Sequence, residues 1–160
     1  MEFYTNEEIE EIIKRSAKIL GVPVEKEASE EIAMRSRFTP RTANYLLKRA
    51  RDFAQVNKED LSKETVQKSL ALLGIDELGL GHSDRALLKT LIEKFGGGPV
   101  GLNTLSAALS EEQSTIEDVH EPYLLQLGLI ERTSRGRTAT TKAFEHLKIK
   151  SKLASQDKLL

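Results

Sequence analysis

The stretch from Ser114 to Thr140 constrains the fold more than any other part of the chain, because its hydrophobic period changes halfway along. The first half predicts a helix that Ser114 caps, with Glu117 three residues on completing a capping box. Apolar side chains recur at helical spacing through this segment, at Ile116, Val119, Tyr123 and Leu127. Gly128 is expected to end the helix, and Pro122 to kink or split it.

The second half has the pattern of two short strands around a turn at Ser134-Arg135-Gly136. The residues suited to strands are Leu129, Ile130 and Thr133 before the turn, and Thr138 and Thr140 after it. A helix followed directly by a tight hairpin is typical of the end of a winged-helix domain. The hairpin also carries Arg132, Arg135 and Arg137, whose fixed, forked positive charge suits phosphate groups. A solvated β-turn is the alternative interpretation of these arginines.

Composition excludes several classes of function. The formal net charge is −1 over 160 residues, so any contact with nucleic acid must come from a local patch. The chain has no cysteine, and His82, His120 and His146 lack carboxylates at ligand spacing, so we expect no metal site. No Walker motif or Gly-x-Ser-x-Gly turn occurs, which leaves no complete active site. No apolar run is long enough to cross a membrane and no signal peptide opens the chain, which favours the cytoplasm.

The first 74 residues predict a bundle of four short helices, each with one apolar face. Their start signals, in chain order, are the capping box of Thr5 and Glu8, then Ser29, then Thr39 followed by Pro40, then Ser62. The fourth helix is expected to face Val66, Leu70 and Leu73 inward and to end at Gly74.

A linker is predicted over residues 75–82, which contain glycines and show no clear period. The second domain, residues 83–147, follows the order helix, helix, helix, hairpin of a winged helix-turn-helix. The glycines from Gly96 to Gly101 lack the Gly-Lys-Ser/Thr ending of a phosphate-binding loop, so they predict turn geometry instead. Residues 148–160 are rich in lysine and serine and are expected to be disordered.

The predicted helix before the hairpin is acidic. Five carboxylates lie just before it or on its expected exposed side, at Glu111, Glu112, Glu117, Asp118 and Glu121. They would repel DNA phosphates, so the wing, not this helix, is expected to contact DNA. Arg41, in the first turn of its helix, is a second candidate phosphate ligand, because a helix N-terminus favours anions. An exposed arginine paired with a carboxylate is the alternative there.

Six segments of the chain form a specific set. They are Glu2-Phe3-Tyr4-Thr5, Thr39-Pro40-Arg41 with Ala43-Asn44, Glu93-Lys94-Phe95-Gly96-Gly97-Gly98-Pro99-Val100-Gly101-Leu102, Thr115-Ile116-Glu117-Asp118-Val119, Glu121-Pro122-Tyr123-Leu124 and Arg132-Thr133-Ser134-Arg135-Gly136-Arg137. With them, about residues 2–147 resemble the C-terminal portion of the RuvB family, the bacterial motors that drive Holliday-junction branch migration. The resemblance implies a mainly α fold, with a four-helix AAA+ lid domain over residues 1–74 and a winged-helix DNA-binding domain over residues 83–147.

The resemblance also implies roles for single residues. Arg41 matches the sensor-2 arginine, which approaches the nucleotide phosphates from the lid and would act in catalysis only with the ATPase domain. Tyr4 matches a residue that lines the nucleotide pocket, and Arg132, Arg135 and Arg137 match the DNA-contacting wing. The nucleotide-binding domain would precede Met1, so ATP and Mg belong to the full-length parent and no activity is expected of this fragment alone.

That parent would be an ATP-dependent DNA helicase that forms a homo-hexameric ring on duplex DNA at Holliday junctions and works with RuvA; the fragment alone would be monomeric. Two positions depart from the family pattern. Phe38 stands where the family usually has glycine, and its bulk would crowd the nucleotide or shift the helix start. Gln113 stands where the family tends to have arginine, which would remove one phosphate contact. A stand-alone winged-helix transcription factor or a protein-interaction adaptor is the alternative function, and the acidic helix counts against the former.

Overall fold

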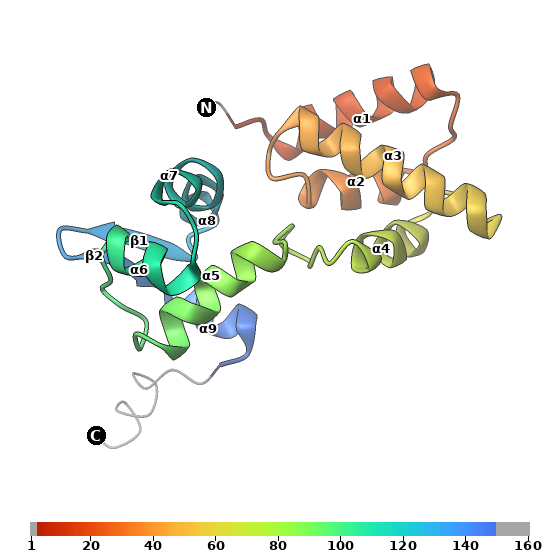
Figure 1. The fold of residues 1–160 in the computed structure, drawn as a ribbon. Coiled ribbons are helices and arrows are strands. Elements are labelled where there is room, and N and C mark those ends of the chain that lie inside the picture. The colour runs from red at the N-terminus through yellow and green to blue at the C-terminus, as the bar shows by residue number, and fades with distance from the viewer. Residues whose placement is uncertain (1–2, 150–160) are drawn as a thin grey trace, which may run out of the picture. The chain divides into compact units, whose positions relative to one another are not determined.

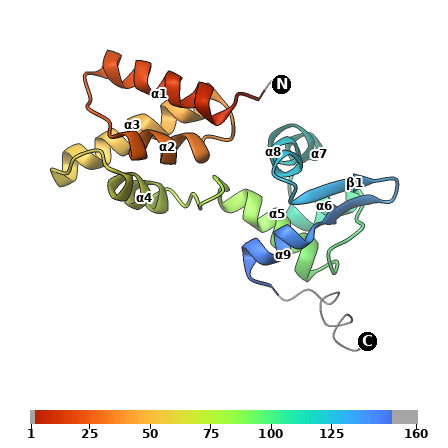
Figure 2. The same ribbon diagram turned by 180° about the vertical axis from the view of Figure 1, so that it is seen from behind.

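The computed structural model describes residues 3–149, which form two compact units: the first ends at Gly81 and the second begins at His82. The first unit is a bundle of helices (Figure 1). They are α1 Asn6–Leu20, α2 Lys26–Met34, α3 Pro40–Asn57 and α4 Lys63–Leu72. The second unit combines helices with one antiparallel hairpin, seen from behind in Figure 2. Its elements are α5 His82–Glu93, α6 Leu102–Leu109, α7 Gln113–Thr115, η1 Ile116–His120, α8 Glu121–Gln126, β1 Ile130–Thr133, β2 Gly136–Ala139 and α9 Thr141–Leu147. The expected mainly α class is confirmed.

Local capping chemistry sets most helix starts in the first unit. The amide of Glu8 donates to Thr5 Oγ1 over 3.2 Å and Glu8 Oε2 accepts from the amide of Thr5, which is the predicted capping box. The starts predicted at Thr39 and Ser62 are confirmed as well, since each hydroxyl accepts an amide three residues on. The start predicted after Ser29 is wrong. Helix α2 already begins at Lys26, and the buried Ser29 donates its hydroxyl to the Lys26 carbonyl within that helix.

The core of the first unit lies where the apolar faces of its four helices meet. Its buried members are Ile9, Ile13, Ala17, Ala28, Ile32, Ala33, Ala43, Leu46, Leu47, Ala50, Ala54, Leu61, Val66 and Leu70. Each fully buried isoleucine or leucine among them stabilises the fold by about 1.5–3 kcal/mol relative to an exposed one. The predicted inward orientation of Leu73 is wrong, because α4 ends at Leu72 and Leu73 is 38% exposed.

The segment predicted as a linker from residue 75 is an ordered turn of the first unit. Asp76 Oδ1 accepts hydrogen bonds from the amides of Leu78 and Leu80, both over 3.0 Å, and Leu80 is fully buried. Gly79 has a φ of 78° and lies against Arg35, where an added Cβ would stand 2.8 Å from the carbonyl oxygen. Only glycine fits this approach. His82, the last residue of the predicted linker, is the first residue of α5.

In the second unit, the hairpin register sets the wing. Ile130 pairs with Ala139, Glu131 with Thr138, Arg132 with Arg137, and Thr133 with Gly136. Thr133 Oγ1 donates to the Gly136 carbonyl and accepts from the Arg135 amide, which closes the turn. The two predicted strands and the turn between them are confirmed, with Gly136 inside the second strand. The predicted strand ends are wrong, because Leu129 precedes β1 and Thr140 caps α9.

The glycine run holds the other edge of β2. Val100 and Arg137 exchange two backbone hydrogen bonds of 3.0 and 2.7 Å, and the amide of Ala139 donates to the Gly97 carbonyl. Gly98 has a φ of 89°, and a Cβ there would collide with the backbone of Arg137. The prediction that these glycines serve backbone geometry is therefore confirmed.

The helix before the hairpin is divided into three consecutive segments. Helix α7 begins at Gln113 behind Glu112, whose side chain makes no capping bond, so the Ser114 capping box was wrong. In the π-helical turn η1, the Glu121 amide donates to the carbonyl five residues back, at Ile116. Pro122 has no amide hydrogen to continue the ladder, so its predicted splitting of the helix is confirmed.

The buried face of this helix passes through His120 and not through Val119. Ile116 and Tyr123 are buried, but Val119 is 56% exposed, and His120 is buried four residues after Ile116. The expectation that Val119 shares the apolar face is therefore wrong, because His120 takes the inner position, where it bonds to Asp84. At the C-terminal end, Lys148 and Ile149 close α9 through backbone hydrogen bonds. The remainder of the predicted disordered tail lies outside the described residues.

Candidate nucleic-acid interface

The three hairpin arginines lie in different surroundings. Arg135 is exposed in the turn, and within residues 3–149 its side chain forms no ion pair. The side chain of Arg132 is 53% exposed, whereas that of Arg137 is 11% exposed. Sequence reasoning treated the three as equivalent, but the structure leaves only Arg135 fully available to a phosphate.

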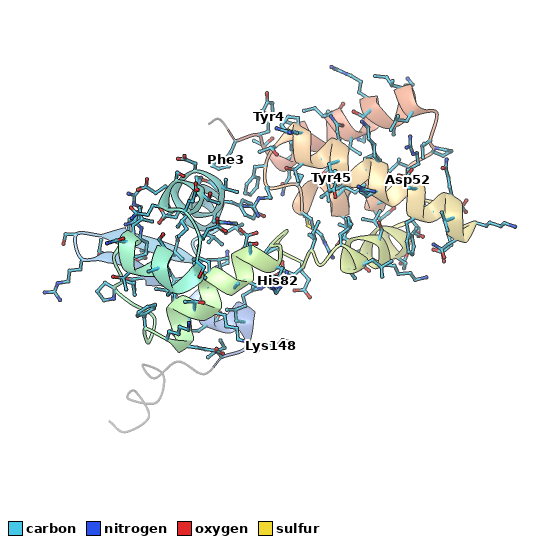
Figure 3. The ribbon with its side chains drawn as sticks, viewed as in Figure 1. Phe3, Tyr4, Tyr45, Asp52, His82 and Lys148 are labelled. Carbon is cyan, nitrogen blue, oxygen red and sulfur yellow. The ribbon has the colours of Figure 1, made fainter. Side chains whose placement is uncertain are left out.

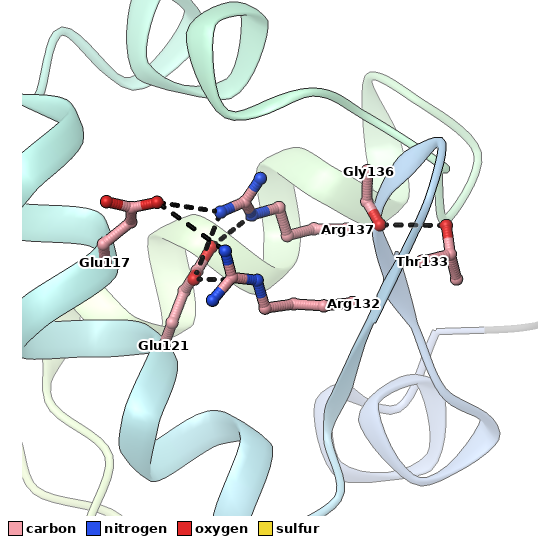
Figure 4. A network of polar contacts seen from close by, with 6 residues as sticks. All are labelled: Glu117, Glu121, Arg132, Thr133, Gly136 and Arg137. Carbon is pink, nitrogen blue, oxygen red and sulfur yellow. Dashed lines mark hydrogen bonds and ion pairs between the residues drawn. The ribbon is translucent and has the colours of Figure 1, made fainter.

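Arg137 is held by Glu121 (Figure 4). Its Nε donates to Glu121 Oε1, and its Nη2 lies 3.4 Å from Glu121 Oε2. The Glu121 side chain is only 1% exposed. The prediction that Glu121 lies on the exposed side of its helix is therefore wrong. Its carboxylate is buried because Arg137 of the hairpin packs against it, a contact between segments 16 residues apart.

Glu117 and Arg132 complete this network. Glu117 Oε1 lies 3.4 Å from Nη2 of Arg137 and 3.7 Å from Nη2 of Arg132. Arg132 Nε is also 3.9 Å from Glu121 Oε2. We call these four residues, Glu117, Glu121, Arg132 and Arg137, the wing clasp. Two carboxylates face two guanidinium groups, so the clasp has no net charge and joins the hairpin to η1 and α8.

The pairing pattern explains why the clasp forms. Arg132 and Arg137 are directly opposite each other across the hairpin, and like charges in that relation repel. Glu117 and Glu121 are four residues apart in the helical region that faces them. The predicted three-residue turn at 134–136 would have paired Thr133 with Arg137, whereas the observed turn of Ser134 and Arg135 sets Arg132 opposite Arg137. The sequence nevertheless placed two arginines on neighbouring strands. That signal could have indicated an acidic partner, although nothing in the sequence specified which one.

The departure at Gln113 has a structural role. Its Nε2 donates to Asn103 Oδ1 over 3.0 Å, which ties α7 to α6. An arginine has no acceptor but can donate to the same oxygen, so the change removes a positive charge while keeping a donor at this place. The side chain of Gln113 remains exposed to solvent.

The predicted nucleotide residues lie on two segments of the first unit that a backbone hydrogen bond joins. The amide of Tyr4 donates to the Phe38 carbonyl over 3.0 Å, so the chain before α1 runs beside the chain before α3. Tyr4, labelled in Figure 3, is 41% exposed. Arg41 is exposed in the first turn of α3, and within residues 3–149 it has no carboxylate partner. The alternative of a carboxylate-paired arginine is not what the structure has.

Phe38 has a left-handed backbone with a φ of 56°, and so does Arg37 before it, at 58°. Glycine adopts this conformation without strain, which gives a physical reason for the glycine that the resemblance implies at this position. The Phe38 ring meets that of Phe3 edge to face, with centroids 5.9 Å apart. Helix α3 still begins at Pro40, so the expected shift of the helix start is wrong.

The histidines do not form a site. His120 Nδ1 lies 2.7 Å from Asp84 Oδ1, and this buried pair joins η1 to α5. Within residues 3–149, no three histidine or acidic side chains converge as metal ligands would. None of the helices in that range combines the length and apolar character that crossing a bilayer requires.

The chain is similar to known proteins over both units. A family model described as the RuvB AAA lid domain matches residues 4–76, and one described as the RuvB C-terminal winged helix domain matches residues 77–148. The Holliday junction branch migration complex subunit RuvB of Dehalococcoides mccartyi is 55% identical over 150 residues, covering 93% of this chain and 43% of the relative. The same-named subunit of Chloroflexus aggregans is 56% identical over 146 residues, covering 91% and 42%.

The chain is also similar to solved structures over both units. The Thermotoga maritima RuvB Holliday junction branch migration motor superposes with a TM-score of 0.91 at 50% identity, covering 94% of this chain and 51% of that one. The chain thus spans less than half the length of the two curated relatives, and the similarity to them is to one part of a longer protein.

Proposed function

The chain belongs to the RuvB family, and on this basis we propose that it supplies the lid and the DNA-gripping wing of a motor that uses ATP to move Holliday junctions. Its two units correspond to the lid and winged-helix domains of that family. The relatives are named as subunits of a branch migration complex, which supports a role inside an assembly. The parent would act as a homo-hexameric ring on duplex DNA with RuvA, in the cytoplasm.

The wing binds the DNA backbone without reading sequence. The observation that carries this proposal is Arg135, which is exposed at the tip of the hairpin and forms no ion pair within residues 3–149. The hairpin itself is held along β2 by backbone hydrogen bonds to the glycine loop. Arg132 is the second contact, since half of its side chain is exposed and its ion pairs are long. Arg137 was expected to be a third contact, but its guanidinium is occupied by the wing clasp.

The lid contributes to a nucleotide site that another domain completes. Arg41 fits a phosphate ligand because it is exposed, unpaired within residues 3–149 and placed at the N-terminus of an 18-residue helix. Tyr4 fits a pocket wall because it is partly exposed and tied to the loop that leads into the same helix. ATP and Mg would be bound mainly by the nucleotide-binding domain of the parent, and Arg41 would stabilise charge on the phosphates.

A salt titration tests the wing. The affinity of the 160-residue chain for two duplexes of unrelated sequence is followed by NMR at several salt concentrations, for wild type, Arg135→Ala and the control Arg15→Ala. Arg15 is an exposed arginine of α1, so its loss changes the net charge equally. We expect Arg135→Ala to weaken binding to both duplexes and to reduce the log–log salt slope by roughly one unit, whereas the control does not. A loss confined to one duplex would support the transcription-factor alternative, and an absence of wild-type binding to both would support an adaptor. An unchanged affinity in Arg135→Ala would overturn the proposed contact.

A further inference from the structure

Arg137 differs from the other hairpin arginines in burial and in partners. Its backbone pairs with Val100 on one edge and Arg132 on the other, and its side chain is nearly covered. The partner it contacts most closely, Glu121, lies on a helix 16 residues earlier in the sequence and is itself buried. This residue therefore joins three segments of the second unit: the glycine loop, the hairpin and α8.

We infer that Arg137 is a positioning residue that fixes the wing against α8 through Glu121, and that it does not contact DNA. The inference rests on the proposed function, because it takes DNA as the ligand of the wing. It states which arginine orients the hairpin and which ones contact the phosphates. In this arrangement Arg137 and Glu121 set the direction of the hairpin, and Arg135 at its tip meets the phosphate.

A phosphate contact by Arg137 would have to replace its bonds to Glu121. If its guanidinium turned to DNA, the Glu121 carboxylate would remain buried with only the long contact to Arg132, at 3.9 Å. A buried charge without a close partner is strongly unfavourable. A surface phosphate contact returns less than this costs, so Arg137 stays with Glu121 when DNA binds.

Arg132, in contrast to Arg137, can leave its carboxylate partners at little cost. Its contacts to Glu117 and Glu121 are 3.7 and 3.9 Å long, and about half of its side chain is exposed. When Arg132 leaves, both carboxylates still have Arg137, at 3.4 Å from Glu117 and in direct hydrogen-bond contact with Glu121. The clasp therefore releases one arginine to DNA without stranding a buried charge, and the arginine it retains is Arg137.

The first test exchanges the buried pair for an apolar one in the 160-residue chain. Arg137→Met and Glu121→Leu are made singly and together, and each variant is measured by thermal unfolding, by NMR titration with a duplex and by its salt slope. We expect either single change to lower the unfolding midpoint by more than about 10 °C and to weaken DNA binding. The double variant should recover both the midpoint and the affinity, with the wild-type salt slope. If stability returns but affinity stays low and the slope falls by about one unit, Arg137 is a phosphate contact and the inference is overturned.

A conservative variant tests the same point if the double variant does not fold. Arg137→Lys keeps the charge that a phosphate needs but loses the planar fork that Glu121 binds. The positioning role predicts displaced hairpin amide resonances, a lower unfolding midpoint and weaker DNA binding. Wild-type hairpin resonances with unchanged affinity would overturn it. Both amide shifts and unfolding are measured without DNA, so a failure of the proposed DNA binding, read from Arg135→Ala, is distinguished from a failure of this inference.

Discussion

The backbone amide of Tyr4 donates a hydrogen bond to the carbonyl of Phe38, and this contact joins two segments that lie 34 residues apart. It places the chain that leads into α1 beside the loop that leads into α3, where Arg41 begins its helix. The two residues assigned to nucleotide binding are thus attached to one loop, and that loop has an unusual backbone. The backbone angles of this loop predict how substitutions at Phe38 change the stability of the first unit.

Phe38→Gly should change the stability of the first unit by less than about 1 kcal/mol. Glycine relieves the left-handed strain, of about 1–2 kcal/mol, but loses the ring contact with Phe3 and adds freedom to the unfolded chain. Phe38→Val also loses the ring contact and keeps a backbone that β-branched residues rarely adopt, so it should be less stable than the glycine variant. Urea unfolding of both variants measures the difference, and equal stabilities would contradict the strain argument.

Gly98→Ala should destabilise the second unit by about 2 kcal/mol or more, because left-handed strain adds to a collision with the Arg137 backbone. Gly101→Ala is the matched control. It lies in the same loop with a φ of −67° and has open space around an added Cβ, so the expected cost is about 0.5–1 kcal/mol, from replacing a favourable N-cap residue of α6. Thermal unfolding compares the two, and a similar loss in both would show that the loop does not depend on close approach to β2.

Glu117→Gln should tighten DNA binding several-fold at low salt, since it removes the exposed carboxylate that pairs with Arg132 and leaves the buried Glu121 with Arg137. Asp118→Asn is the control, because it removes the same charge from the neighbouring exposed position, and within residues 3–149 Asp118 forms no ion pair. Fluorescence anisotropy with a labelled duplex gives both affinities. Equal gains for the two variants would mean that general repulsion, and not the pairing of Arg132, limits binding.

Arg41→Ala should slow ATP hydrolysis in the full-length motor more than it weakens nucleotide binding, because a cation aimed at the phosphates stabilises charge that develops during transfer. A loss of about 2.7–4 kcal/mol in the barrier, or 100- to 1000-fold in kcat, is typical for such a contact. Arg49→Ala, on the same helix and stacked over Tyr45, is the control and should keep kcat. Steady-state hydrolysis and nucleotide titration measure both terms, and an unchanged kcat in Arg41→Ala would remove the proposed sensor role.

Local sequence signals were enough to predict most of the secondary structure. The capping box of Thr5 and Glu8, the Thr39-Pro40 start and the turn around Arg135 all depend on contacts within a few residues. Such contacts form wherever the chain goes, so they can be read before the fold is known. The start of α2 was missed because serine also bonds to the backbone inside a helix, and Ser29 does so.

Which arginine is available to contact DNA was decided only by the tertiary structure. The sequence alone does not distinguish Arg132, Arg135 and Arg137. No local pattern in it shows that Glu121, which follows the π-helical turn, packs against the hairpin. The partners that separate the three arginines lie 11 to 20 residues away, so burial and pairing arise only when the hairpin folds back on α8. The sequence by itself determined that a short hairpin would present three positive charges. The packing of that hairpin determined that one charge is buried, one is shared and one is free, because a buried carboxylate requires a cation beside it.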